Sequence, residues 1–346
     1  MRRIVPLVVG TLSIAAHAAA TKGGPCSGDQ DMLSIRGSWT TQPDVPGTTT
    51  GRPRSATPQV AARIDKLAQL FRAAYPDPRG MEAAGYRVLG ATPEVSPGPY
   101  AYDYNSLYKA WYCNTNLHKV LLGAETATWA YAFVNHLGWF AEQPRDFRVE
   151  GSPTYLLTKR SGSFKGHPAY EGIHNQSSNT GQTFSRAILV TRGGRSPLKP
   201  VTRRQFLEAY LAYSQAQAGP QRAALEKYTQ DPTKRAEVLR NFDAQVQKRE
   251  SAARTRLSSL SPTEASQPAI LAQGGVGDFK DFGTEERGGR ALMRFDKSYF
   301  QPGMPPESPQ FVVIYWRWQK SAPSMAFREE FEQRFDAAGV QALLDR

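Results

Sequence analysis

The sequence is poor in the features that mark metal sites and membrane spans. It contains only two cysteines among 346 residues, which excludes a zinc site built from several thiolates of one chain. After the N-terminus, no stretch approaches the roughly 20 apolar residues that cross a bilayer. No repeat occurs at the spacing of solenoids or propellers. We therefore expect neither a bound metal nor an integral membrane protein.

Motifs of common enzyme families are also missing. The chain has no Gly-x-Ser-x-Gly nucleophile elbow, no Walker A loop, no Gly-x-Gly-x-x-Gly after a strand and no His-Glu-x-x-His. Ser196 and Lys199 match Ser-x-x-Lys, but Pro200 follows them and the companion motifs of penicillin-recognising enzymes are missing. The sequence indicates no cofactor, and it leaves open whether the protein is an enzyme.

The first 20 residues have the pattern of a secretory signal peptide. Arg2 and Arg3 precede a mostly apolar run, and Ala18 to Ala20 supply the small residues of a cleavage site. The alternative, a membrane anchor, needs a longer apolar run. We expect a secreted or periplasmic protein after cleavage near Ala20. Cleavage would remove two arginines and no acid, which lowers the formal net charge from +12 to +10.

The two cysteines that would remain, Cys26 and Cys113, predict one disulfide. An oxidising compartment permits this bond. It would close a loop of more than 80 residues and tether the N-terminal tail to the rest of the chain. The alternatives are two free thiols, or Cys113 as a small buried apolar residue.

Composition divides the remaining chain into a tail and one domain. Residues 21–57 are rich in Gly, Pro, Thr and Ser and have little apolar periodicity, which predicts a flexible tail. Thr57 and Pro58 are typical of a helix start, and apolar residues then recur at helical spacing as far as Ala74. Residues 58–346 are predicted to form a single α+β domain.

A first β-hairpin is predicted early in this domain. Gly123-Ala124 would join strands 117–122 and 125–136 through a two-residue loop. In that register His118 lies opposite Trp129, and the two side chains are expected to stack.

A second hairpin and a central strand are predicted further along. Gly193-Gly194 would join Ser185–Thr191 to Arg195–Val201, because both glycines can adopt positive φ. Phe311–Trp318 is apolar on both faces, which predicts a strand covered on both sides.

The segment 203–258 predicts a helical insertion. Thr202 and Gln205 form a capping box at its start, and Gly219-Pro220 is expected to end its first helix. Residues 259–290 are rich in Ser, Gly and Gln and predict a long loop. The predicted fold class is α+β, with a single mostly antiparallel sheet covered by helices and a helical elaboration at about 203–258.

Histidines provide the candidate catalytic residues. On a helix, His167, Glu171 and His174 would place three zinc-compatible side chains on one face. Glycines and a proline within the segment favour a loop instead. His136 is a further candidate. These four residues would serve an exported hydrolase or another envelope enzyme.

A tyrosine-rich run provides the candidate ligand-binding residues. Exposed Tyr and Trp side chains combine a broad apolar surface with a polar group, which suits sugars or peptide segments. Arg203 begins a predicted helix, where the dipole disfavours a cation, so it indicates either a nearby anion or simple exposure. The candidates are Tyr102, Tyr104, Tyr108, Trp111, Tyr112 and Arg203.

The positive charge and the missing catalytic motifs favour binding over catalysis. A basic protein attracts anionic partners. We expect an exported, non-catalytic envelope protein that binds a ligand or partner, with the envelope enzyme as the alternative. The expected partner is an envelope protein or an anionic glycan. Sequence-specific recognition of nucleic acid is not expected, because the basic residues are scattered along the chain.

Overall fold

The computed structural model shows a mixed α+β fold, which confirms the predicted class. It describes residues 21–27, 31–45, 57–95, 98–124, 126–144, 146–173, 177–178, 181–272, 275–277 and 279–344. The predicted signal peptide lies outside the described residues. No helix in the described part of the chain is long and apolar enough to cross a membrane.

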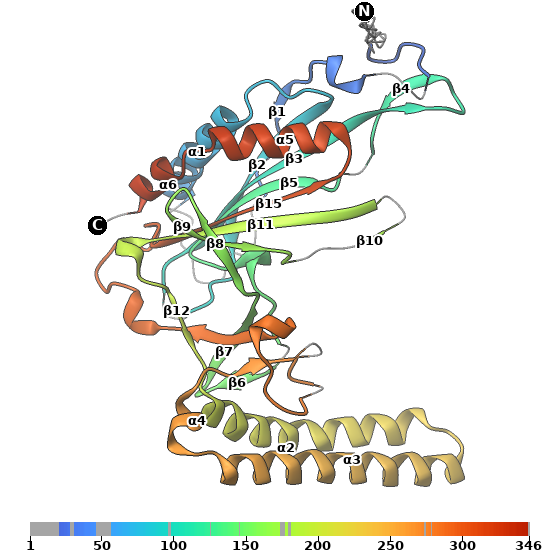
Figure 1. Ribbon diagram of the computed structural model, residues 1–346, viewed down its shortest axis with the longest axis vertical. Coiled ribbons are helices and arrows are strands. Elements are labelled where there is room, and N and C mark those ends of the chain that lie inside the picture. The colour runs from blue at the N-terminus through green and yellow to red at the C-terminus, as the bar shows by residue number, and fades with distance from the viewer. Residues whose placement is uncertain are drawn as a thin grey trace, which may run out of the picture.

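A large sheet forms the centre of the molecule (Figure 1). Its strands are antiparallel except for the pair β1–β2. Two further strands, β4 (Lys119–Leu122) and β10 (Ser177–Ser178), pair with β3 and β11. The order across the sheet is β1 (Trp39–Thr41), β2 (Met81–Ala91), β3 (Ala101–Asn114), β5 (Thr128–Val134), β15 (Phe311–Gln319), β11 (Gly181–Thr191), β9 (His167–Glu171) and β8 (Arg160–Phe164).

A second, smaller sheet corrects the expectation of a single sheet. Tyr155 and Leu157 of its strand β7 pack against the large sheet, in one apolar cluster with Val313 and Tyr315. Burial of these side chains explains why the strands form a separate layer. The order is β12 (Leu198–Pro200), β14 (Arg290–Phe295), β7 (Ser152–Leu157) and β6 (Arg148–Val149), with β13 (Ile270–Leu271) paired to β14.

Helices cover the other face of the large sheet. They are α1 (Thr57–Ala74), α5 (Ala322–Arg334) and α6 (Ala337–Leu343), and all three lie on one side in Figure 1. The apolar stripe of α1, which includes Ile64 and Phe71, is buried as its periodicity predicts. Phe71 contacts Phe331 and Phe335 at ring-centre distances of 5.7 and 5.6 Å, so the helices and sheet share one core.

The predicted central strand near the C-terminus is confirmed. β15 lies between β5 and β11, and it is buried along almost its whole length. Trp316 faces the helices, whereas Tyr315 faces the opposite side. This two-sided burial is the reason that the strand is apolar on both faces.

The first predicted hairpin is wrong. β4 pairs with the second half of β3, because β3 extends for 14 residues and projects beyond the core. β5 pairs instead with the first half of β3, where Trp129 lies opposite Leu107. His118 lies in the turn between β3 and β4, away from Trp129.

The second predicted hairpin is also wrong. A short 3-10 turn, η4 (Arg192–Gly194), follows β11, and the chain then leaves the large sheet. β12 pairs with β14 in the second sheet, where Leu198 is buried. Burial of this apolar residue between the layers outweighs the local preference of two glycines for a tight hairpin.

A long helical arm projects from the second sheet. It consists of α2 (Arg203–Tyr228) and α3 (Pro232–Ser259), and the predicted capping box at Thr202 is present. The predicted break at Gly219-Pro220 is wrong: α2 continues through an exposed Pro220, where water can satisfy the backbone. The arm points the same way as β10 and the β3–β4 hairpin, which makes the outline C-shaped (Figure 1). The segment predicted as a loop after residue 259 contains α4 (Pro262–Ser266), β13 and η5 (Glu285–Arg287).

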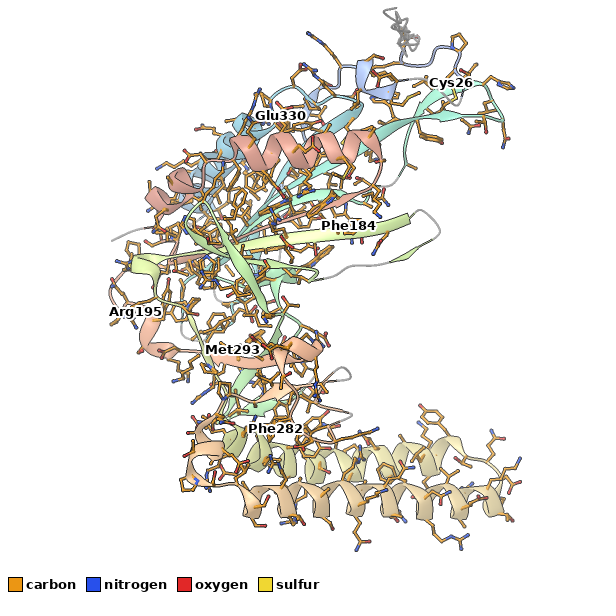
Figure 2. All side chains as sticks on the ribbon, in the orientation of Figure 1. Cys26, Phe184, Arg195, Phe282, Met293 and Glu330 are labelled. Atoms are coloured by element: carbon orange, nitrogen blue, oxygen red, sulfur yellow. A yellow bond between two sulfur atoms is a disulfide. The ribbon has the colours of Figure 1, made fainter. Side chains whose placement is uncertain are left out.

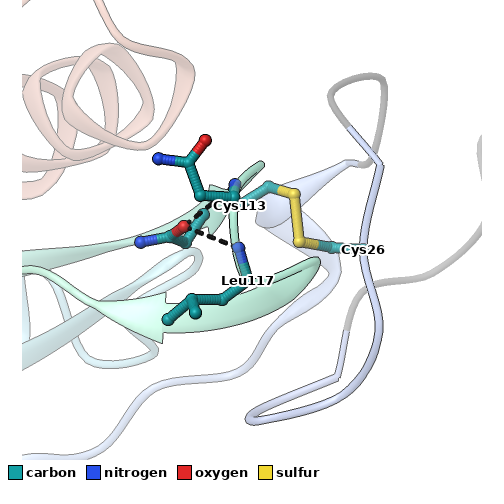
Figure 3. Close-up of a disulfide and its surroundings, with 5 residues drawn as sticks. Cys26, Cys113 and Leu117 are labelled. Carbon is teal, nitrogen blue, oxygen red and sulfur yellow. Dashed lines mark hydrogen bonds between the residues drawn. A yellow bond between two sulfur atoms is a disulfide. The ribbon is translucent and has the colours of Figure 1, made fainter.

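The predicted disulfide between Cys26 and Cys113 is present, with the Cα atoms 5.8 Å apart (Figure 3). It ties the N-terminal segment to the end of β3. Backbone hydrogen bonds add to this attachment, including that from Cys26 N–H to the His118 carbonyl at 3.0 Å. The described part of the tail therefore lies along the sheet.

Candidate ligand-binding site

The large sheet has a face that the second sheet covers only at one end. On the uncovered part, Ala84 lies opposite Leu107, Leu107 opposite Trp129, and Trp129 opposite Arg317. Side chains directly opposite one another in neighbouring strands share a face. These four residues therefore form a row across β2, β3, β5 and β15, which we call the open row.

Arg317 is the unusual member of the open row. The residue is only 6% exposed, and its guanidinium carbon lies 3.5 Å from the centre of the Trp129 ring. Its Nε donates to the Ala127 carbonyl at 3.1 Å. Among the described residues, no carboxylate lies within 4.0 Å of it. Arg186 and Arg290, by contrast, each form ion pairs with glutamates.

Burial lowers the pKa of Arg317, and the neighbouring Tyr315 and Tyr131 partly oppose this shift. A guanidinium remains charged at neutral pH even so. Burying a charge without a counter-ion costs free energy. An anionic ligand beside the guanidinium would supply the counter-ion and lower this free-energy cost. Stacking on Trp129 stabilises the charge and holds the guanidinium plane in place.

Aromatic side chains continue the site next to Arg317. Trp139, on the short 3-10 helix η3 (Gly138–Phe140), is 41% exposed. Its ring centre lies 4.8 Å from that of Trp129 and 5.5 Å from that of Tyr131. Trp129 is fixed by a hydrogen bond from its Nε1 to the Thr126 carbonyl at 2.9 Å. The site therefore combines a rigid indole with an exposed one.

A hollow of about 800 Å³ adjoins the other end of the open row. Ala84 and Leu107 belong to both, and Val45 and Leu122 add exposed apolar surface. Lys109 and Glu82 lie opposite each other on β3 and β2, and both line the hollow; Glu82 also pairs with Lys22. The binding surface thus extends from an apolar hollow to a positively charged, aromatic end.

This arrangement suits recognition of a ligand with an acidic group and an apolar surface. A guanidinium pairs with a carboxylate or sulfate through parallel N–H donors, and an exposed indole packs against the C–H face of a sugar ring. The uncovered face presents no histidine beside Arg317 among the described residues.

The structure places two of the predicted catalytic residues on one strand. His167 and Glu171 begin and end β9, and Glu171 pairs with Arg186, whose Nε lies 2.8 Å from Oε1. Four residues along a strand separate two side chains by about 13 Å. Burial lowers the pKa of His167. His174 lies outside the described residues, and no group of three metal-ligating side chains occurs within the described part.

His136 belongs to a buried charged cluster that sequence reasoning missed. Its Nε2 contacts the Asp103 carboxylate, and both side chains are nearly inaccessible to water. Burial alone lowers the pKa of His136, but Asp103 and the more distant Glu94 outweigh it and raise the pKa. Glu94 accepts a hydrogen bond from the Tyr155 hydroxyl. The cluster joins β3, the end of β5 and the second sheet.

The tyrosine run divides between core and surface. Tyr102, Tyr104 and Tyr108 are buried beneath the helices and form part of the core. Trp111 is half-buried, whereas Tyr112 is 44% exposed. The sixth candidate, Arg203, lies over the Phe282 ring at 5.0 Å, at the base of the arm. These six residues do not form a single surface.

The sequence did contain one signal for the site that the structure shows. Arg317 interrupts the apolar strand Phe311–Trp318, and a charge within a two-sided buried strand requires a partner or a function. Trp139 carried no such signal, because its approach to Trp129 depends on the turn after β5. In comparisons with known proteins, no family model, no curated protein and no solved structure matches the chain.

Proposed function

We propose that this is an exported, non-catalytic binding protein whose ligand is an acidic glycan held on the open row. The single observation that carries the proposal is the buried guanidinium of Arg317, stacked on Trp129 with no carboxylate partner among the described residues. The Cys26–Cys113 disulfide supports export, because such bonds persist in oxidising compartments.

The geometry suits a sugar acid in particular. The guanidinium and the Trp139 ring both contact Trp129, at 3.5 and 4.8 Å from its ring centre, so these two groups are at most about 8 Å apart. A uronate ring stacked on Trp139 would bring its carboxylate within reach of Arg317. Further sugar units would extend along Leu107 into the hollow, where Lys109 and Glu82 can both hydrogen-bond to sugar hydroxyls.

Binding is favoured over hydrolysis by the positions of the histidine candidates. Glu171 is held by Arg186, and His167 lies at the far end of the same strand. His136 is enclosed with Asp103 beneath the surface. None of these described groups lies in the open row.

The test is a calorimetric titration of the mature chain with an oligogalacturonate and with a neutral oligosaccharide of equal length. We expect the acidic sugar alone to bind. R317Q should weaken binding tenfold to a hundredfold, since a hydrogen bond to a charged group contributes about 1.5–3 kcal/mol. W139A should weaken it about tenfold without affecting folding, because Trp139 is partly exposed.

Tyr228→Ala provides the matched control, because this aromatic side chain is 77% exposed on the distant arm. It should bind the acidic sugar as the wild type does. Equal binding of the neutral sugar, or full affinity in both R317Q and W139A, would contradict the proposal. If R317Q folds poorly, R317K takes its place. Lysine keeps the charge and an aliphatic stem but lacks the paired N–H donors of the guanidinium, so a loss of affinity in R317K reports on those hydrogen bonds.

A further inference from the structure

A second hollow lies at the other end of β11 from the open row. Its volume is about 560 Å³, and the turn Arg192–Arg195, Tyr299 and two glutamine side chains line it. Figure 2 shows Arg195 and Phe184 at opposite ends of the strand. Phe184 adjoins Ser185, which lies opposite Arg317, so the two sites are separate.

Two arginines give this hollow its charge. Arg192 and Arg195 both line it, and neither has a carboxylate within 4.0 Å among the described residues. Burial raises the pKa of Tyr299, and the positive charges of both arginines oppose that rise. Both arginines thus line the hollow together with this hydroxyl.

The turn between these arginines leaves its backbone accessible. Gly193 and Gly194 both have positive φ, at 54° and 72°, and a Cβ atom on either would meet no atom within 4 Å. Glycine is suited to such a turn because it has no steric cost there. A ligand can thus approach the main chain between the two arginines.

Contacts outside the hollow hold two of its lining residues, Arg192 and Tyr299, in place. The Arg192 N–H donates to the Tyr299 hydroxyl at 3.2 Å, and that hydroxyl donates to the Gln310 carbonyl at 2.6 Å. The Arg192 guanidinium is held 2.9 Å from the sulfur of Met304. A pre-positioned arginine loses less side-chain entropy when it binds an anion.

We propose that this hollow, the Arg192–Arg195 site, binds the phosphate ester of a small hydroxyl-bearing molecule such as a sugar phosphate. Two arginines that line one hollow can both donate hydrogen bonds to a tetrahedral oxyanion. The hollow is within the size range of small-molecule sites, about 300–1,000 Å³, and therefore exceeds what a free ion fills. Gln301 and Gln341 line the remaining space and can hydrogen-bond to ligand hydroxyls.

Calorimetry of the mature chain with glucose 6-phosphate, inorganic phosphate and glucose tests this site. The ester should bind at least tenfold more tightly than inorganic phosphate, and glucose should not bind. R195Q should weaken ester binding at least tenfold, and because Arg195 is exposed this variant should fold. R192Q should act in the same direction. R240Q, which removes an exposed arginine from α3, should change the affinity less than twofold.

Several results would overturn the proposal. The proposal is wrong if the wild type does not bind the ester, or if R195Q binds it as tightly as the wild type does. It is also wrong if R240Q loses as much affinity as R195Q, because the loss would then come from the change in net charge. Equal affinity for inorganic phosphate would assign the site to the free ion. Loss of glycan binding in the wild type would leave this proposal standing, because the open row and the Arg192–Arg195 site lie at opposite ends of β11 and share no lining residue.

Discussion

Removal of the Cys26–Cys113 disulfide should destabilise the protein strongly. The bond joins residues 87 positions apart, and the loop between them contains α1, β1, β2 and most of β3. In the chain-entropy treatment, a cross-link of this span restricts the unfolded chain by about 4–5 kcal/mol. Cys26 is also buried with Ile35 and Val120, so its replacement leaves the packing of a small cluster altered.

The native contacts around the bond limit how much of that value is lost. Segment 23–26 remains attached through backbone hydrogen bonds to Val120 and His118, and Lys22 still pairs with Glu82. We therefore expect the double variant C26S/C113S to lose about 3–4 kcal/mol of its free energy of unfolding. The fold should be retained, because the main apolar clusters do not include either cysteine.

Urea denaturation measures this effect. Oxidised wild type, wild type with reductant, and C26S/C113S are compared, and the reductant should affect only the wild type. The reduced protein and the variant should unfold at similar urea concentrations, well below the oxidised midpoint. A loss of less than about 1 kcal/mol would refute the reasoning, since it would mean that the cross-link restricts the unfolded chain little.

Two further predictions concern the core and the buried charges. Phe331→Ala should cost about 3–5 kcal/mol in denaturant unfolding, because the ring is fully buried against Phe71 and Trp316; Leu117→Ala, at a side chain 59% exposed, should change stability by at most about 0.5 kcal/mol. The raised pKa of His136 means that its pairing with Asp103 stabilises the fold fully below pH about 6.5 and progressively less as the pH rises through the folded-state pKa. Unfolding measured from pH 6 to 9 should therefore show a decline that H136Q lacks; parallel profiles would count against the pair as its cause.

The two binding proposals depend on the same physical feature, arginines that the fold holds without acidic partners. The chain has acids available, and it uses them elsewhere: Arg87 pairs with both Asp44 and Asp65. Arg317 and Arg195 have no such neighbours among the described residues. Sites that keep a positive charge unneutralised are positioned to receive an anion from outside the chain.

The local sequence pattern was sufficient to predict several structural elements. The periodicity of α1, the capping box at Thr202 and the two-sided apolar strand β15 were predictable because each depends on residues close in sequence. The disulfide was predictable from chemistry, since the chain contains only two cysteines. Together, these features were sufficient to predict the α+β fold class.

Strand pairing and the sites were decided by tertiary structure. Two glycine turns favoured hairpins between strands that are neighbours in sequence. Burial of β5 between β3 and β15, and of β12 beside β14, stabilises the fold by more than the turn preference does, so it decides the pairing. The same pairing brings Arg317 against Trp129, 188 positions earlier in the chain, and places Asp103 against His136. Such contacts join segments whose sequence patterns are independent of each other, so only the folded sheet reveals which polar groups meet and which remain unpaired.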